Sequence, residues 1–296
     1  MGKRDPIRLA LVSLLCEGHI LLEDVPGVAK TMLARSLATS LGCSFARIQC
    51  TPDLLPSDIT GAYVFNQKTS EFDFRPGPVL HQVVLADEIN RATPRSQSAL
   101  LECMGEAQLT VDGQTFALPR PFMVIATQNP IEHEGTFPLP EAQLDRFLVR
   151  LSVGYPTFVD ENMMLERIRG RHPIESLQQV SEAAELQACQ QAVHEVFVHE
   201  AVREYVVRLV QSTRRCPDLA IGGSPRASLA LYRTSQALAA LEGRNYALPD
   251  DAKGLALAVL PHRVILNPES RLRGKNTFQV IDDLIQTVPA PVGRQM

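Results

Sequence analysis

The sequence of 296 residues lacks tryptophan, and aromatic residues make up only 5% of it. Exposed aromatic platforms on which nucleic-acid bases stack are therefore not expected. The formal net charge is −4, so the chain also lacks the basic excess typical of a non-specific nucleic-acid binder. No run of 18 apolar residues is present, and we expect no membrane-spanning helix.

Cysteine is scarce and follows no pairing or metal-binding pattern. The six cysteines form no CxxC pair, and no histidine lies at ligand spacing from them. The basic start at Lys3 and Arg4 is followed by Arg8, which interrupts the apolar run, and by no small-residue cleavage site. We therefore expect a buried first helix around residues 7–16, reduced thiols and a cytoplasmic location.

What the chain does contain is 45% hydrophobic residues in two different patterns. Up to about Tyr155, short apolar runs alternate with helical stretches, which predicts a parallel sheet covered on both faces. After Pro156 the pattern is helical, over roughly 160–170, 182–194, 199–214, 226–241 and 249–260, with a short candidate at 279–286. We therefore predict an α/β domain over 1–156 and an all-helical domain over 157–296.

A candidate phosphate-binding turn lies between a predicted strand at 20–22 and a predicted helix at 30–41. Its residues are Asp24, Val25, Pro26, Gly27, Val28, Ala29, Lys30, Thr31 and Met32. Lys30 and Thr31 fit the usual phosphate-loop pattern, whereas Asp24 and Ala29 replace its two glycines. Backbone N–H groups at a helix N-terminus bind phosphate whatever the side chains, and Asp tolerates a left-handed backbone. We expect Lys30 at the β- and γ-phosphates and the Thr31 hydroxyl on Mg²⁺.

Two carboxylates follow the apolar run at 83–86, which is typical of an interior parallel strand. Ligands of parallel sheets bind beyond the carboxyl ends of the strands. We expect Asp87 to hold Mg²⁺ and Glu88 to polarise an attacking water. Solvated loop carboxylates are the alternative, but the turn about 55 residues upstream favours one shared site.

These motifs together resemble the MoxR family of AAA+ ATPases. The resemblance is carried by residues 22–31, by Asp-Glu-Ile-Asn-Arg-Ala at 87–92, by Ala-Thr-Gln-Asn-Pro at 126–130, by 139–147 and by 223–227. It implies an AAA+ core with a parallel sheet, followed by a smaller helical lid. It also implies ATP as substrate, Mg²⁺ as cofactor and a hexameric ring.

The resemblance also assigns roles to single residues. Asn129 resembles the sensor-1 residue, although an Asn before Pro130 is also typical of a turn. Arg146 resembles the arginine finger supplied to a neighbouring subunit, the alternative being a pair with Glu141 or Asp145. Arg226 resembles the sensor-2 residue of the lid, or else is a surface arginine at a helix start. Arg91 is a weaker candidate for a subunit interface.

Further segments are similar to the family outside these motifs. A loop-hairpin at 61–78 and a hairpin at 108–118 correspond to loops that face the ring pore in related ATPases. Phe65, Phe72 and Phe74 are candidates for exposed aromatics there, with core packing as the alternative. Family members have a longer N-terminal segment that helps hold adenine, and residues 1–3 correspond to its end. We expect structural roles for His81, His133 and His262.

Three functions remain open at this point. The first is an ATP-hydrolysing chaperone or remodeller that acts in complex assembly, enzyme maturation or metal insertion. It would act with a von Willebrand factor A domain partner and a client protein. The second is a nucleotide-dependent oligomeric scaffold without turnover. The third, a DNA-acting motor, is disfavoured because the chain has no basic run longer than two residues.

Overall fold

The computed structural model describes residues 2–129, 135–167 and 173–291. Contacts divide the chain into two compact units, each formed by several segments. The first unit consists of 1–8, 19–140 and 151–187, and the second of 9–18, 141–150 and 188–296. The boundary near residue 156 was predicted from a change in the sequence pattern. It stays a prediction, because the two units are defined by contacts and each contains several segments of the chain.

One sheet of five parallel strands organises the α/β part of the chain. Its order is β2-β5-β8-β1-β9. The strands are β1 (His19–Glu23), β2 (Phe45–Gln49), β5 (Val83–Asp87), β8 (Met123–Gln128) and β9 (Phe147–Leu151). β1, β5 and β8 are buried along almost their whole length, because each is an unbroken apolar run between two neighbours. β2 lies at the edge and has exposed polar positions.

The register of these strands sets which polar residues end up side by side. Glu23 of β1 aligns with Gln128 of β8, and Gln49 of β2 aligns with Asp87 of β5. Because parallel strands end at the same edge, these carboxyl ends lie together. The turn after β1, the acidic end of β5 and the end of β8 therefore share one rim of the sheet.

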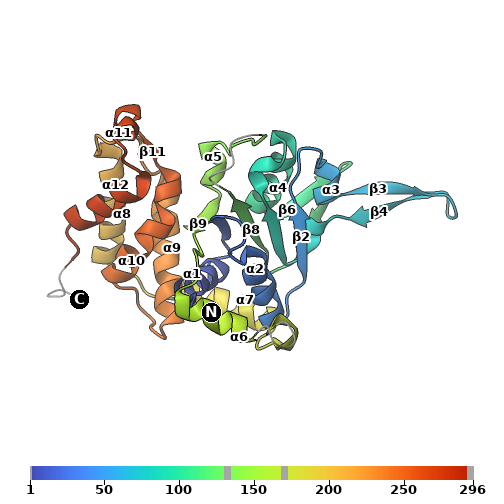
Figure 1. Cartoon of the computed structure of the whole chain (residues 1–296), viewed down its shortest axis with the longest axis horizontal. Coiled ribbons are helices and arrows are strands. Elements are labelled where there is room, and N and C mark those ends of the chain that lie inside the picture. Colours follow the sequence, from blue (N-terminus) through green and yellow to red (C-terminus); the bar gives the residue numbers. More distant parts are fainter. Residues whose placement is uncertain (1, 130–134, 168–172, 292–296) are drawn as a thin grey trace. The chain divides into compact units, whose positions relative to one another are not determined.

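Two antiparallel hairpins belong to the same unit as this rim. They are formed by β3 (Gly61–Asn66) with β4 (Glu71–Pro76), and by β6 (Gln108–Val111) with β7 (Gln114–Ala117). Both segments were predicted as hairpins, and both predictions are confirmed. The longer hairpin, β3–β4, projects well beyond the sheet edge at β2 (Figure 1).

Most of the remaining regular structure is helical. The helices are α1 (Arg4–Leu15), α2 (Lys30–Ser40), α3 (Pro56–Thr60), α4 (Pro94–Glu106), α5 (Glu141–Leu144), α6 (Phe158–Arg167), α7 (Ala183–His194), α8 (Glu200–Arg215), α9 (Pro225–Leu241), α10 (Pro249–Val259), α11 (Pro268–Leu272) and α12 (Thr277–Thr287). No helix in the described ranges is both long and apolar enough to cross a bilayer.

The C-terminal region packs α8, α9, α10 and α12 around their apolar faces (Figure 1). In α8 the buried positions recur with helical spacing, from Val202 through Tyr205 to Leu209. The predicted helical character of this region is confirmed. It also contains a short antiparallel pair, β10 (Leu219–Ile221) with β11 (Ile265–Leu266), which the sequence pattern did not indicate. Strands of two or three residues are too short to show alternation.

Candidate active site

The turn between β1 and α2 takes a backbone shape suited to an anion. Gly27 and Ala29 both have left-handed backbones, with φ of 86° and 63°. Ala29 directly precedes α2, and no side chain caps the helix there. The N–H groups of the first helical turn have no intrahelical carbonyl as acceptor. They can therefore donate hydrogen bonds to a ligand.

Asp24 has a different role in the turn from the one its position suggested. An Asp can tolerate a left-handed backbone at this position, but the left-handed residues of the turn are Gly27 and Ala29. The buried carboxylate of Asp24 instead accepts hydrogen bonds from Val153 N–H (2.6 Å), Gly154 N–H (2.6 Å) and Ser152 Oγ (3.0 Å). Burial raises the pKa of Asp24, but these bonds outweigh it and hold the pKa below its ordinary value. Asp24 therefore fastens the start of the turn to residues 152–154.

Lys30 closes the same turn from its other end. Its Nζ donates to the backbone carbonyl of Asp24 at 2.8 Å, across the mouth of the loop. Within the described ranges, that carbonyl holds the flexible ammonium, which is well suited to exchange it for a phosphate oxygen. The loop is thus preformed on two sides, by the Asp24 carboxylate and by Lys30.

The acidic end of β5 is held by residues of its two neighbouring strands. Thr127 Oγ1 of β8 donates to Asp87 Oδ1 at 2.7 Å. Arg47 of β2 donates to Asp87 Oδ2 through Nη2 (2.6 Å) and Nε (3.1 Å). The carboxylate of Asp87 is therefore fixed in orientation from both sides.

Glu88 has a left-handed backbone, with φ of 58°, which is uncommon for a residue with a side chain. Its N–H donates to Thr127 Oγ1 at 2.8 Å, so the same threonine orients both acidic residues. Its Oε2 accepts from Gln49 Nε2 at 3.3 Å and lies 3.4 Å from Arg91 Nη1. A backbone strained in this way is often found at functional sites.

A pocket of about 330 Å³ joins the turn to the acidic strand end. It is lined by Pro26, Gly27, Ala29, Lys30, Thr31, Met32, Asp87, Glu88 and Asn129. Three further predicted residues of the turn, Asp24, Val25 and Val28, are not among its lining residues. The donor set fits a magnesium-bound phosphate chain, since it offers a hydroxyl, carboxylates and an ammonium in one concave site. Asp87 and Thr31 would hold the cation.

The two arginines suggested by resemblance belong to the second compact unit. Arg146 follows α5 and is exposed, while Arg226 is exposed in the first turn of α9. Ser224 Oγ caps α9 by accepting from the Arg226 N–H at 3.1 Å. Asp145 pairs with the buried Arg263, and Ser224 Oγ donates to Asp145 Oδ2 at 3.3 Å. Both arginines are thus connected through Asp145 and Ser224 within one unit.

The histidines lie apart from this chemistry. His262 is buried and contacts the Phe147 carbonyl, and burial lowers its pKa to about 3. The ring of His81 contacts the Pro78 carbonyl. His133 and Pro130 lie outside the described residues.

Arg47 and Gln49 were not predicted as site residues. They are two positions apart on β2 and therefore on one face of that strand, where Arg47 Nη2 also donates to Gln49 Oε1 at 2.5 Å. The signal in the sequence is two polar residues on one face of a strand that pairs with the acidic strand. That signal becomes readable only when the strand order is known, because β2 and β5 are 33 residues apart along the chain.

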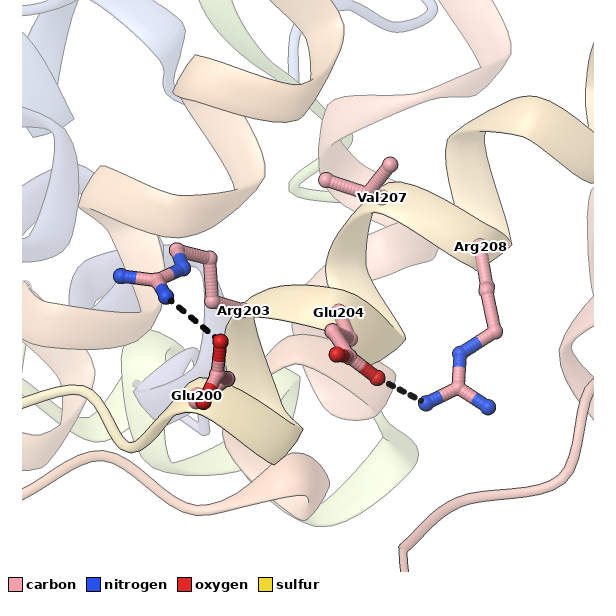
Figure 2. Close-up of a pocket in the computed structure, with 5 residues that line it drawn as sticks. All are labelled: Glu200, Arg203, Glu204, Val207 and Arg208. Atoms are coloured by element: carbon pink, nitrogen blue, oxygen red, sulfur yellow. Dashed lines mark hydrogen bonds and ion pairs between the residues drawn. The ribbon is translucent and has the colours of Figure 1, made fainter.

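A second, larger depression of about 550 Å³ lies along α8 and carries no comparable chemistry. Figure 2 shows its lining side chains, which all come from this one helix. Glu200 pairs with Arg203 (3.4 Å) and Glu204 with Arg208 (2.9 Å), one helical turn apart. Such exposed pairs are typical of a solvated helix face and contribute little stability.

Comparisons with known proteins agree on the family of this chain. Residues 19–149 match the model of the ATPase family associated with various cellular activities (AAA), and 211–284 match the AAA lid domain. The chain is 51% identical to the Bacillus subtilis protein YeaC, covering 99% of this chain and 92% of that one. It is 43% identical to the chaperone MoxR1 of Mycobacterium tuberculosis, covering 98% and 79%.

A solved structure extends the agreement to three dimensions. The crystal structure of a proposed ATPase from Cytophaga hutchinsonii superposes with a TM-score of 0.92 at 38% identity, covering 98% of this chain and 91% of that one. The chain therefore belongs to the MoxR family of AAA+ ATPases.

Proposed function

We propose that this chain binds ATP with Mg²⁺ and hydrolyses it to ADP and phosphate. The single observation that supports this most is the pocket in which Lys30 and Thr31 meet Asp87 and Glu88. These four residues come from two segments about 55 positions apart. Random surface charges would not converge in this way at the carboxyl edge of a parallel sheet.

Each pocket residue has a task that its chemistry suits. The turn's N–H groups and the Lys30 ammonium bind the phosphate oxygens. Thr31 and Asp87 hold Mg²⁺, which when bound neutralises charge on the phosphates. Glu88 orients the attacking water and accepts its proton. Asn129 donates to, or accepts from, the water or the terminal phosphate, because an amide can do both.

We propose that two arginines also act on the bound nucleotide. Arg226 contacts the nucleotide bound to its own subunit, and Arg146 contacts the nucleotide of a neighbour in a ring. A guanidinium supplies several fixed donors and a spread positive charge, which suits the equatorial oxygens of a transferring phosphoryl group. We propose a homo-oligomeric ring, a hexamer, as the working form.

We propose that hydrolysis drives remodelling of a client protein in the cytoplasm. The similarity to a relative named as a chaperone supports this role. Complex assembly, enzyme maturation or metal insertion are the processes in which we expect it. We further propose a von Willebrand factor A domain partner, and a domain boundary near residue 156.

Phosphate release at steady state tests this proposal. We expect the wild-type chain to release phosphate in the presence of Mg²⁺, and the Glu88→Gln variant to be at least 100-fold slower, within the range that a positioned proton acceptor contributes. Arg95→Gln, which removes an exposed charge outside the pocket, is the control and should keep the wild-type rate. Equal rates for wild type and Glu88→Gln would remove Glu88 from the mechanism.

A nucleotide-dependent scaffold is the second candidate, and one observation favours it. Gln49 and Arg91 both contact the Glu88 carboxylate, which leaves fewer of its lone pairs for a water molecule. If these contacts persist with ATP bound, the chain would assemble without turnover. ATP-dependent assembly combined with no phosphate release from the assembled wild type would support the scaffold over the ATPase.

A further inference from the structure

The hairpin β3–β4 collects its aromatic side chains on one face. The register pairs Tyr63 with Phe74 and Phe65 with Phe72, and directly opposed residues of an antiparallel pair share a face. Their ring centroids are 5.4 Å and 5.3 Å apart. In a chain with 11 Phe, 5 Tyr and no Trp, four aromatics thus form one continuous strip on a single hairpin.

The second hairpin, β6–β7, covers half of this strip. Phe116 of β7 stacks on Phe74 with centroids 4.4 Å apart and an interplanar angle of 13°. The hydroxyl of Tyr63 donates to Gln114 Oε1 at 2.5 Å. The outer half stays uncovered, with Phe65 51% and Phe72 68% exposed. The half of the strip formed by Tyr63 and Phe74 is therefore packed against β6–β7 and joins the two hairpins. The half formed by Phe65 and Phe72 is exposed.

A cleft of about 330 Å³ lies where the covered half meets the open half. It is lined by Tyr63, Phe72, Asp112 and Gln114. Asp112 is at the turn of β6–β7, where its left-handed backbone (φ 49°) and that of Gly113 (φ 80°) form the hairpin bend. Within the part of the chain that the structure describes, the Asp112 carboxylate makes no hydrogen bond or ion pair. The cleft therefore combines two aromatic rings with one exposed carboxylate that no described residue pairs with.

We propose that this cleft binds a basic side chain, lysine or arginine, of an extended segment in a client protein. Aromatic rings attract cations, and the carboxylate supplies the opposite charge. The long apolar stem of either side chain can lie along the exposed Phe72 while its head reaches Asp112. This inference rests on the proposed function only in taking a protein client as the ligand.

Charge decides between a basic and a purely apolar occupant. An apolar side chain would cover the Asp112 carboxylate without replacing its water, which costs free energy. An acidic side chain would meet a like charge. The basic residue Arg75 aligns with Ala62 on the other face of β3–β4, so it is not placed to neutralise the cleft. The cleft therefore selects for positive charge.

Peptide binding to the full-length chain tests the proposal. Fluorescence anisotropy would compare 12-residue Gly-Ser peptides that carry three arginines, three norleucines or three glutamates, with and without ATP. We expect the arginine peptide to bind at least tenfold more tightly than the norleucine peptide, and the glutamate peptide not to bind. Asp112→Asn should weaken the arginine peptide about tenfold, and Asp112→Lys should transfer the preference to the glutamate peptide.

The controls separate this inference from folding and from the ATPase. Asn adopts left-handed backbone readily, so Asp112→Asn should keep the hairpin intact. Glu71→Gln removes the same charge from the opposite face of β3–β4 and should leave binding unchanged. Equal binding of arginine and norleucine peptides, no binding of either, or no effect of Asp112→Asn would overturn the inference. Phosphate release without peptide should be unchanged in these variants, and its absence in wild type would contradict the proposed function alone.

Discussion

At the residue scale, His19 is a buried titratable group that lies outside the pocket. Its Nε2 contacts the Met104 carbonyl (3.1 Å), and its Nδ1 accepts from the Val124 N–H (3.0 Å). The second bond needs a neutral ring. Burial lowers the pKa of His19 to about 4, and the Met104 carbonyl opposes this only in part. His19 thus ties the start of β1 to α4 and to β8 in one protonation state.

This predicts a loss of stability on acidification. Between the unfolded pKa near 6.5 and the folded pKa near 4, the unfolded chain binds more protons, so stability falls as pH falls through this window. From pH 7 to pH 5 the free energy of unfolding should drop by about 2 kcal/mol on account of His19. His19→Gln can keep both hydrogen bonds without titrating, and should lose less over the same range.

Urea unfolding of both proteins at pH 7 and pH 5 measures this difference. His81→Gln serves as the matched control, because the His81 ring is only partly buried and contacts the Pro78 carbonyl. The same pH dependence in wild type and His19→Gln would show that His19 is not the titrating group responsible.

At the element scale, the phosphate-binding turn depends on a side chain at a position where the usual pattern has glycine. Asp24 accepts three hydrogen bonds from residues 152–154, and Lys3 Nζ reaches the Gly154 and Tyr155 carbonyls (3.0 and 2.7 Å). The turn is therefore supported by chain that is distant in sequence. This support explains how a loop with Ala29 in place of a glycine keeps a defined shape.

Removing the support should weaken nucleotide binding. For Asp24→Ala we expect the Kd of a fluorescent ATP analogue to rise about tenfold, equivalent to about 1.4 kcal/mol, because the loop loses its preformed shape. Asp24→Asn keeps one acceptor oxygen and should lose less. Asp53→Ala, an exposed acid outside the turn, should bind as wild type does. Unchanged affinity in Asp24→Ala would mean that the turn holds its shape without this carboxylate.

Elements were predictable from sequence to the extent that their signals are local. Apolar runs located β1 and β5, and the hairpin pattern located β6–β7, since each pattern is complete within a few residues. The roles of Asp24 and Arg47 were not predictable. Their partners, residues 152–154 and Asp87, are 128 and 40 positions away at the nearest, and only the folded chain brings them together.

At the scale of the whole molecule, the residues proposed to act on ATP are distributed over both units. The first unit contains the phosphate-binding turn, Asp87, Glu88 and Asn129, and the second contains Arg146 and Arg226. Asp145 links the α5–β9 segment to Ser224 at the start of α9, so both arginines belong to one hydrogen-bonded part of the second unit. Sequence motifs in both units were sufficient to identify the correct family. They did not indicate that residues 141–150 pack with the C-terminal helices.

We propose that Glu88 promotes hydrolysis of an ATP molecule that Lys30 binds. The most direct test measures the nucleotide bound per subunit after incubation with ATP and Mg²⁺, rapid filtration and acid quench. We expect mainly ADP on the wild type, ATP without ADP on Glu88→Gln, and no retained nucleotide on Lys30→Ala. Accumulation of ADP on Glu88→Gln at the wild-type rate would contradict it.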